Sequence, residues 1–232
     1  MKTLVITGAS AGIGLSTATL FHEQGYRVVN LSRRRGGFEH GTWIAADLAA
    51  PGWIEPVSRA LIAEIQHASE VVIVHNGALL VQDNVDRSDD DALLQVMQAN
   101  VIAAIQLNRL LRPYLDAGSA IIYIGSSLSE AAVPNRLSYT VSKHAQLGLM
   151  RATAVELQGR GMHTACICPG LTDSELALQH VRDNNADQLV LQDARLHRAL
   201  KSAEIAGMVY FCAVTPAVNG AVIHANRPPA AG

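Results

Sequence analysis

The stretch Thr7-Gly8-Ala9-Ser10-Ala11-Gly12-Ile13-Gly14 decides the fold of this chain. It follows an apolar run, Leu4-Val5-Ile6, and it precedes a helix-like segment, Leu15 to Gln24. Strand, glycine-rich turn and helix in this order place bare backbone N–H groups at a helix N-terminus, where a pyrophosphate can bind. Gly8 permits the tight turn, Gly12 permits close approach of the phosphates, and Gly14 permits the helix to pack on the strand. The stretch therefore predicts a nucleotide-binding turn, with a plain turn as the alternative.

Short apolar runs alternate with longer amphipathic segments along the rest of the chain. This alternation predicts an α/β fold in which helices cover both faces of a parallel sheet. Right-handed crossovers then give a doubly wound, Rossmann-type sheet of about seven strands in a single domain, residues 1–232. We expect Gly25 to follow the C-terminus of the first helix and Asp89 to cap the third. The expected strands are 3–7, 26–31, 42–45, 71–75, 119–125, 162–167 and 220–224, and the expected helices are 13–24, 53–67, 89–115, 138–158 and 202–213.

The composition limits the classes of protein to which the chain can belong. With 232 residues, 49% of them hydrophobic, it is long enough for one domain with a substantial core. A net charge of −2 lacks the excess of basic residues that is typical of nucleic-acid binding. No apolar run is long enough for a membrane span. The N-terminus runs directly into a strand, so we expect no signal peptide and a cytoplasmic protein. The three cysteines are expected to be reduced, with Cys166 and Cys168 packing on one side of a strand, and no ligand pairs stand at zinc spacing, so no metal is expected.

Residues 171–200 interrupt the alternation with a long polar segment. A loop of this length within a compact domain is usually functional or mobile. Because it leaves the edge of the sheet where ligands bind in such folds, we interpret it as a substrate lid. The alternative is a helical insertion on the surface. His180, Arg182 and His197 within it are candidates for anion recognition, with solvent exposure as the alternative.

Tyr139 and Lys143 provide the clearest catalytic pattern in the chain. They begin and end the segment Tyr-Thr-Val-Ser-Lys at the start of an expected helix, and this spacing places both side chains on one face. A nearby ammonium favours the phenolate, so we expect the pKa of Tyr139 to fall below its usual value of about 10. Such a tyrosine is a general acid for carbonyl reduction or a base for alcohol oxidation. The alternative is an aromatic residue on a helix with an exposed lysine nearby.

Three further features are candidates for the same site. Ser126 follows the strand run Ile121 to Ile124, where its hydroxyl can hold a substrate carbonyl oxygen. Asn100 lies inside the expected helix 89–115, an unfavourable position unless its amide has a bonding role. His75-Asn76-Gly77-Ala78 follows the fourth strand, at the edge where a ribose or nicotinamide would lie. The alternatives are ordinary loop chemistry for the serine, a satisfied or solvent-facing amide for Asn100, and a simple turn.

In their order along the chain, these motifs resemble the short-chain dehydrogenase/reductase family, over about residues 3–224. The glycines have the family's form G-x-x-x-G-x-G, and its Asn-Ser-Tyr-Lys tetrad falls on Asn100, Ser126, Tyr139 and Lys143. Its Asn-Asn-Ala-Gly segment resembles His75-Asn76-Gly77-Ala78, with His for the first Asn and Gly-Ala in reversed order. Its Pro-Gly-x-x-Thr stretch resembles Pro169-Gly170-Leu171-Thr172, with Thr one place early. The expected cofactor-binding residues are Gly8, Ser10, Gly12, Ile13, Gly14, Ser32, Arg33, Asp47, Leu48, Asn76, Gly77, Ala78, Tyr139, Lys143, Pro169, Gly170 and Thr172.

The resemblance implies hydride transfer between a nicotinamide and a substrate carbonyl or secondary alcohol. Tyr139 would donate the proton, and Ser126 would hold the oxygen on which charge develops. Lys143 would lower the pKa of Tyr139 and hold the nicotinamide ribose. Asn100 would anchor a water that links Lys143 to solvent. The cofactor would supply the difficult chemistry and the protein its orientation.

The residues after the second strand indicate which cofactor binds. An acidic residue there would bond the free 2′-hydroxyl of NAD, but this chain has Asn30-Leu31-Ser32-Arg33-Arg34-Arg35. Arg offers a planar fork for a phosphate, and Ser32 adds a hydroxyl. We therefore expect NADP(H), with Arg33 as the best candidate. The resemblance to the family also implies that Asp47-Leu48 lies at the adenine. NAD(H) is the alternative, in which case the arginines form a solvated loop.

The expected substrate class follows from apolar residues near the site, and the expected assembly follows from the family. A pocket lined by Leu128, Pro134, Leu137 and Leu171 suggests a small or medium carbonyl compound with an apolar portion. A homodimer or homotetramer is expected by analogy with the family, through the long helices 89–115 and 138–158.

The predicted activity as a carbonyl reductase has several alternatives. They are a non-catalytic NAD(P)-binding regulator, an NAD-preferring alcohol dehydrogenase, and epimerisation or dehydration on the same scaffold. The complete tetrad favours simple reduction or oxidation.

Overall fold

The computed structural model describes residues 1–173 and 199–226. Its seven strands are parallel and form one sheet in the order β3-β2-β1-β4-β5-β6-β7. The order runs outward in both directions from the neighbours β1 and β4, which confirms the predicted doubly wound, Rossmann-type single domain. The strands are β1 Lys2–Thr7, β2 Arg27–Ser32, β3 Thr42–Ala45, β4 Glu70–His75, β5 Ala120–Ile124, β6 His163–Pro169 and β7 Ala221–Ala225.

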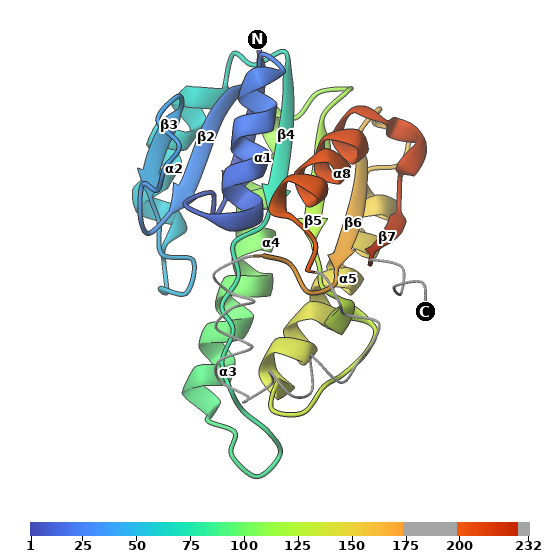
Figure 1. Cartoon of the computed structure of the whole chain (residues 1–232). Coiled ribbons are helices and arrows are strands. Elements are labelled where there is room, and N and C mark those ends of the chain that lie inside the picture. Colours follow the sequence, from blue (N-terminus) through green and yellow to red (C-terminus); the bar gives the residue numbers. More distant parts are fainter. Residues whose placement is uncertain (174–198, 227–232) are drawn as a thin grey trace.

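Helices cover both faces of the sheet (Figure 1). Helices α1 and α8 lie on one face, and α2, α4 and α5 lie on the other. Alternation along the strands sends side chains to both layers: on β1, Val5 joins one core cluster, whereas Leu4 and Ile6 join the other. The helices are α1 Gly12–Glu23, α2 Ile54–Ile65, α3 Asp90–Met97, α4 Ala103–Leu111, α5 Leu137–Glu156 and α8 Ser202–Val214.

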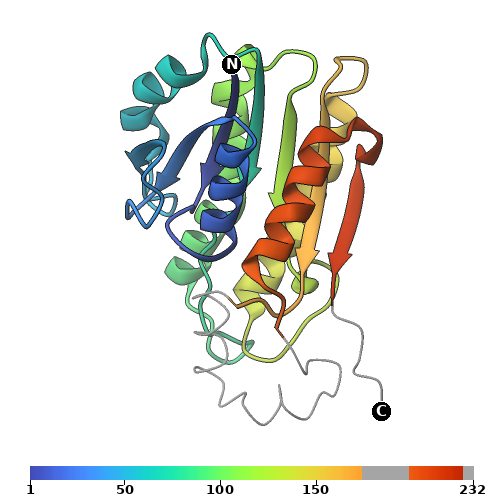
Figure 2. The same ribbon diagram turned by 45° about the horizontal axis from the view of Figure 1, so that its top comes forward.

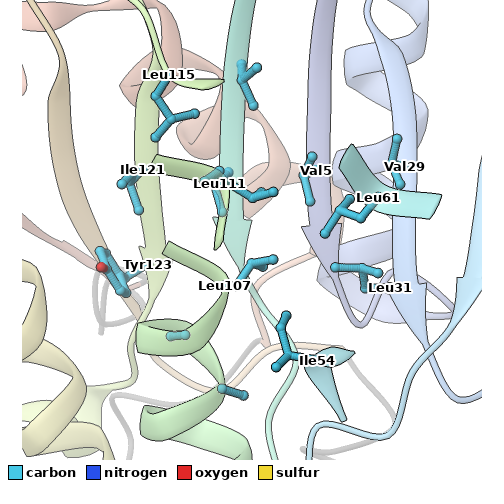
Figure 3. Packing of buried hydrophobic residues seen from close by; sticks show 14 of the residues in the cluster. Val5, Val29, Leu31, Ile54, Leu61, Leu107, Leu111, Leu115, Ile121 and Tyr123 are labelled. Carbon is cyan, nitrogen blue, oxygen red and sulfur yellow. The ribbon is translucent and has the colours of Figure 1, made fainter. Parts of the chain in front are cut away.

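The larger core cluster binds α2 and α4 to the sheet. Leu61 of α2 packs toward Val29 and Leu31 of β2, while Leu107 and Leu111 of α4 lie over the central strands (Figure 3). All five side chains are fully buried. Burying a leucine side chain contributes about 1.5–3 kcal/mol to folding, so this layer fixes the sheet on which the site is built.

The expected single helix 89–115 is wrong in one respect, because the segment is interrupted. A π-helical turn, Gln98–Ile102, separates α3 from α4, and a 3₁₀ turn, Arg112–Tyr114, follows α4. Within the π-helical turn the N–H of Ala103 donates to the carbonyl of Gln98, five residues earlier. Such turns are frequent at functional sites, and this one contains Asn100. The expected Asp89 cap is confirmed, since its carboxylate accepts the N–H of Asp91.

The ends of the expected lid are described, but its centre, residues 174–198, lies outside the described residues, as do His180, Arg182 and His197. The N–H of Asp173 donates to the carbonyl of Leu200 at 2.9 Å, and the N–H of Leu200 donates to the carbonyl of Leu171 at 2.9 Å. The N–H of Ser202 donates to Asp173 Oδ1 at 2.6 Å. These bonds join the end of β6 to the start of α8.

All seven strands end at the same edge of the sheet (Figure 2). In open parallel sheets, ligands bind outside the carboxyl ends of the strands, so this edge is where the predicted site residues should meet. Among the described residues, no helix combines the length and the apolar character that crossing a membrane requires.

Candidate active site

The glycine turn between β1 and α1 needs its glycines for backbone conformation and for close packing. Gly8 and Gly12 have φ of 72° and 55°, in the region that favours glycine. A Cβ on Gly14 would lie 2.3 Å from the carbonyl oxygen of Gly8 and 2.8 Å from Cα of Ala9. The N–H of Gly8 donates to Leu31 of β2 at 2.8 Å, so the turn is held against the neighbouring strand. The helix N-terminus is left as a cradle of backbone, which fits the pyrophosphate of a dinucleotide.

Asn76 and Gly77, which follow β4, are bonded to this turn. The Asn76 amide donates to the carbonyl oxygens of Thr7 and Gly8, both at 3.0 Å. The N–H groups of Asn76 and Gly77 both donate to the Thr7 hydroxyl, at 3.0 and 2.9 Å. A Cβ on Gly77 would lie 2.8 Å from Leu48 Cδ1 and 3.3 Å from the Thr7 side chain, so a larger residue here would displace Leu48 at the cavity. Thr7 organises both segments and is absent from the predicted binding set, although the motif contains it.

The arginine loop after β2 has a fixed backbone and exposed side chains. The Ser32 hydroxyl donates to the carbonyl of Arg34 at 2.7 Å, so its proton positions the loop. A Cβ on Gly36 would lie 2.4 Å from Cα of Ser10, which shows how closely the loop approaches the glycine turn. Arg33 and Arg34 both line the main cavity, whereas Arg35 is not among its lining residues. Two of the three arginines therefore face the nucleotide side of the cavity.

Tyr139 and Lys143 lie in the first turns of α5, as their spacing predicts. Both are buried, and Lys143 Nζ lies 5.6 Å from the centre of the Tyr139 ring. The expected lowering of the Tyr139 pKa is wrong in net direction. Burial raises this pKa to about 12, against smaller opposing effects from a hydrogen bond with Ser126 and from the charge of Arg136. Tyr139 therefore keeps its proton at neutral pH, the state that a general acid needs.

The Lys143 ammonium is held by atoms of the chain itself. It donates to the carbonyl of Ile124 at 2.7 Å and to Gln146 Oε1 at 3.0 Å. Burial lowers the pKa of Lys143 from 10.5 to about 8, because a low-dielectric environment disfavours the charged form. An ammonium has three donors, so one N–H remains for a ligand in the cavity.

Ser126 follows β5 and begins a 3₁₀ turn, Ser127–Ser129. Its hydroxyl oxygen accepts the N–H of Leu128 at 3.1 Å, and its own N–H donates to Ser129 Oγ at 3.1 Å. This capping fixes the side chain and does not use the hydroxyl proton, which is directed to the Tyr139 oxygen in the hydrogen bond described above. A Cβ on the preceding Gly125 would lie 2.9 Å from the sulfur atoms of both Cys166 and Cys168, so the turn rests on these thiols. Both thiols are free and buried on one side of β6, as predicted.

Asn100 has a bonding role that explains its position within a helical segment. Its side chain accepts the N–H of Leu79 at 2.7 Å and donates to the carbonyl of Leu79 at 2.9 Å. It also donates to Ser142 Oγ at 2.9 Å, which connects the π-helical turn to α5. Its main-chain carbonyl accepts Gln146 Nε2 at 3.2 Å. Asn100 thus supports the loop after β4 and the helix that carries Tyr139.

One cavity of about 580 Å³ brings these elements together. Gly14 and Asn100 do not line it: Gly14 packs beneath the turn, and the buried side chain of Asn100 bonds to Leu79 and Ser142. Ser126 lines it, and the predicted cofactor residues along it are Gly8, Ser10, Gly12, Ile13, Ser32, Arg33, Asp47, Leu48, Asn76, Gly77, Ala78, Tyr139, Lys143, Pro169, Gly170 and Thr172.

The predicted substrate lining is partly wrong. Leu128 and Leu171 line the cavity, but Pro134 and Leu137 do not. The chain turns at Asn135, with φ of 59°, which leaves Pro134 exposed and places Val133 on the cavity instead. Leu79, Leu80 and Asn226 also line it and were not predicted. No local pattern marks these residues, because they reach the cavity from two separate segments, after β4 and after β7.

Another departure is His75, which stands where the family has its first asparagine. It is buried, and Nε2 lies 2.8 Å from Asn108 Oδ1. Burial lowers its pKa to about 4, so the imidazole is neutral and belongs to the core behind the site.

Among residues 1–173 and 199–226, no group of three or more His, Cys, Asp or Glu side chains is placed to hold a metal ion.

Comparison with known proteins agrees with this geometry. A family model described as enoyl-(acyl carrier protein) reductase matches residues 8–227. The chain is 29% identical to dehydrogenase/reductase SDR family protein 7-like of Drosophila melanogaster, over 76% of this chain but only 59% of that protein's length. It is 26% identical to 3-oxoacyl-[acyl-carrier-protein] reductase MabA of Mycobacterium tuberculosis, over 96% of this chain and 90% of that protein.

A solved structure of a short chain dehydrogenase family protein from Francisella tularensis has the same fold. Its TM-score is 0.86 at 25% identity, over 97% of this chain and 96% of that one. The chain belongs to the short-chain dehydrogenase/reductase family of oxidoreductases.

Proposed function

We propose that the protein transfers a hydride between NADP(H) and a carbonyl or secondary alcohol substrate. The observation that carries this proposal is the position of Ser126, Tyr139 and Lys143 on the same cavity as the glycine turn. A bound nucleotide with its phosphates on that turn would extend toward the tyrosine. When bound, the nicotinamide supplies or accepts the hydride.

The residues around the substrate oxygen have separable roles in this proposal. Tyr139 remains protonated and donates its proton to the oxygen as negative charge develops there. Ser126 accepts from Leu128, so its own O–H donates to the same oxygen and stabilises that charge. Lys143 uses its remaining N–H for the ribose of the cofactor and places a positive charge near Tyr139.

The preference for NADP(H) over NAD(H) rests on the end of β2. No acidic side chain follows this strand, and Arg33 and Arg34 line the cavity there. The Ser32 and Gly36 contacts fix the loop backbone, so the guanidinium groups start from a defined position. A guanidinium forms bidentate bonds with a phosphate, which supports a 2′-phosphate at this site.

The described part of the substrate side is apolar. Leu79, Leu80, Leu128, Val133 and Leu171 line it, and no charged side chain other than Lys143 is found near Tyr139 along the cavity. This lining supports a neutral carbonyl compound with an apolar portion. The mycobacterial relative is named a 3-oxoacyl reductase, which is consistent with a ketone as the reacting group.

Assembly and location are also proposals. The exposed apolar side chains Leu94, Ile105, Val141 and Val155 lie on α3, α4 and α5, the helices expected to form a homodimer or homotetramer interface. Light scattering after size exclusion would contradict this if it showed only monomer. The three free cysteines support a reducing compartment such as the cytoplasm.

A panel of carbonyl compounds and alcohols, followed by nicotinamide absorbance, tests the proposed activity. We expect turnover with at least one apolar ketone or aldehyde and a higher kcat/KM with NADPH than with NADH. Tight binding of the nucleotide without turnover on any member of the panel would favour a non-catalytic regulator.

A further inference from the structure

Gln146 is a buried amide that the mechanism above does not use. It lies on α5, three residues after Lys143 and seven after Tyr139, so it faces the same side of the helix. Only 1% of it is exposed. Burying an amide costs free energy unless its polar atoms are paired, so the partners of Gln146 show what it does.

The two ends of the amide join two parts of the active site. Lys143 Nζ donates to Gln146 Oε1 at 3.0 Å, and Gln146 Nε2 donates to the main-chain carbonyl of Asn100 at 3.2 Å. The orientation of the amide is fixed by chemistry, because an ammonium can only donate and a carbonyl can only accept. A rotated amide would place donor against donor and acceptor against acceptor.

The carbonyl of Asn100 belongs to the π-helical turn Gln98–Ile102 and accepts the Gln146 amide there. The Asn100 side chain is already committed to Leu79 and Ser142. A small cavity of about 10 Å³, lined in part by Asn100, Gln146 and His75, adjoins the amide. It has room for one water molecule at most, and Lys143 does not line it. The two hydrogen bonds of Gln146 therefore connect Lys143 to the Asn100 carbonyl.

We propose that Gln146 is a positioning residue for Lys143, and that its amide occupies the place between Lys143 and Asn100 that we expected a water to occupy. The inference rests on the proposed function for its catalytic meaning. In this arrangement the Lys143 ammonium is held by the fold, through Ile124 and Gln146, rather than by exchangeable solvent.

Other groups that face Lys143 set the background for a test. They are the Tyr139 phenol on α5 and the Cys166 and Cys168 thiols on β6. Electrostatic interactions with the two thiols raise the pKa of Lys143. None of them changes when Gln146 is replaced. Gln146 Oε1 accepts from the charged form, so removing it should lower the pKa of Lys143 further.

The test is an NMR titration of the Lys143 ε-methylene in the full-length wild type and in Gln146→Met, which has a similar shape but cannot form these bonds. We expect the pKa of Lys143 to fall by about one unit. The free energy of a hydrogen bond to a charged group corresponds to a pKa shift of about this size. Gln106→Met is the matched control. Gln106 lies on α4, and its side-chain oxygen accepts from Trp53 Nε1 and Gln98 Nε2 rather than from Lys143. Its replacement should therefore leave the titration unchanged.

Gln146→Ala separates hydrogen bonding from packing. Alanine leaves space for a water that can bond both Lys143 and the Asn100 carbonyl, so we expect a smaller pKa change than with methionine. A packing role predicts the reverse order, since alanine creates the larger cavity. If Gln146→Met does not fold, Gln146→Glu decides, because a carboxylate at this position should raise the pKa of Lys143.

An unchanged Lys143 titration in folded Gln146→Met, a larger change in Gln146→Ala than in Gln146→Met, or no rise in Gln146→Glu would overturn the inference. The titration requires no turnover, so absence of activity in the wild type would contradict the proposed function alone. Where the wild type is active, the decline of turnover at high pH should begin about one unit lower in Gln146→Met.

Discussion

The two halves of the cavity are built in different ways. The nucleotide half is built around a backbone turn: a Cβ on Gly8 would lie 2.8 Å from Cα of Gly77, and a Cβ on Gly14 would lie 2.3 Å from the carbonyl oxygen of Gly8. The catalytic half is made of buried polar side chains, in which Tyr139, Lys143 and Gln146 are all less than a tenth exposed. An added side-chain atom should distort the backbone turn and so lower nucleotide affinity. Loss of a proton or of a hydrogen bond should instead lower the activity of the polar half. Substitutions in the two halves should therefore have different signatures.

Tyr139→Phe should have the largest effect on activity. Loss of a general acid lowers turnover by about 10²–10⁴-fold, while the glycine turn and nucleotide affinity are untouched. Turnover and NADPH binding measured on the same preparation check this. The matched control is Tyr123→Phe, which removes a buried hydroxyl bonded to Asn108 and Thr153 on the core side of β5. It should cost about 1 kcal/mol of stability with turnover nearly unchanged; equal loss of turnover in both variants would refute the assigned role.

Gly14→Ala should damage the other half of the cavity. The added Cβ meets the carbonyl of Gly8 at 2.3 Å, so the turn must move and nucleotide affinity should fall. We expect a stability loss of about 1–3 kcal/mol, measured by denaturant unfolding and nucleotide titration. Gly207→Ala on α8 is the control, because its Cβ meets nothing within 4 Å. That variant should be neutral or up to about 1 kcal/mol more stable; similar losses in both would contradict the steric account.

Arg33→Ala tests the distal end of the nucleotide half. Loss of a charge-assisted bond to a 2′-phosphate should raise the KM for NADPH by about 10–100-fold and leave the KM for NADH unchanged. Steady-state kinetics with both cofactors provide the measurement. Arg35→Ala, on the same loop but not lining the cavity, should behave as wild type. An unchanged KM for NADPH in Arg33→Ala would remove the basis for preferring NADP(H).

The smallest effect concerns pH. Burial lowers the pKa of Lys143 from 10.5 to about 8, so the ammonium loses its charge as the pH rises through about 8. Because Tyr139 has a pKa of about 12, it stays protonated over the same range. The kcat/KM for reduction should be level below pH 8 and decline above it. In Lys143→Arg the side chain stays charged, so any remaining activity should not decline there; a decline at the same pH would assign it to another group.

In both halves, sequence predicts the local patterns better than the contacts between distant segments. The glycine turn and the Tyr139–Lys143 pair are local patterns, whose spacing directly sets their geometry. Gln146 was missed, although a polar residue at the spacing of Tyr139 and Lys143 on a helix face was a signal. Its partner Asn100 lies 46 residues away along the chain, so only the fold brings the two together.

The direction of the Tyr139 pKa shift was the feature that sequence predicted least well. The Tyr139–Lys143 spacing suggested a lowered Tyr139 pKa, but burial dominates and raises it. Burial depends on the loops that cover α5 from elsewhere in the chain, which no local pattern contains. The interruption of helix 89–115 has a similar cause, because Asn100 bonds to Leu79 and Ser142, which belong to other segments.

Transfer of deuterium from C4-deuterated NADPH to a carbonyl compound tests most directly whether the two halves form one site. The account predicts that the label appears on the carbinol carbon of the product and that its transfer is largely lost in Tyr139→Phe, which still binds the nucleotide. Wild-type protein that binds NADPH but transfers no label to any carbonyl of an apolar panel would contradict the central claim that the nucleotide on the glycine turn is a reactant beside Tyr139.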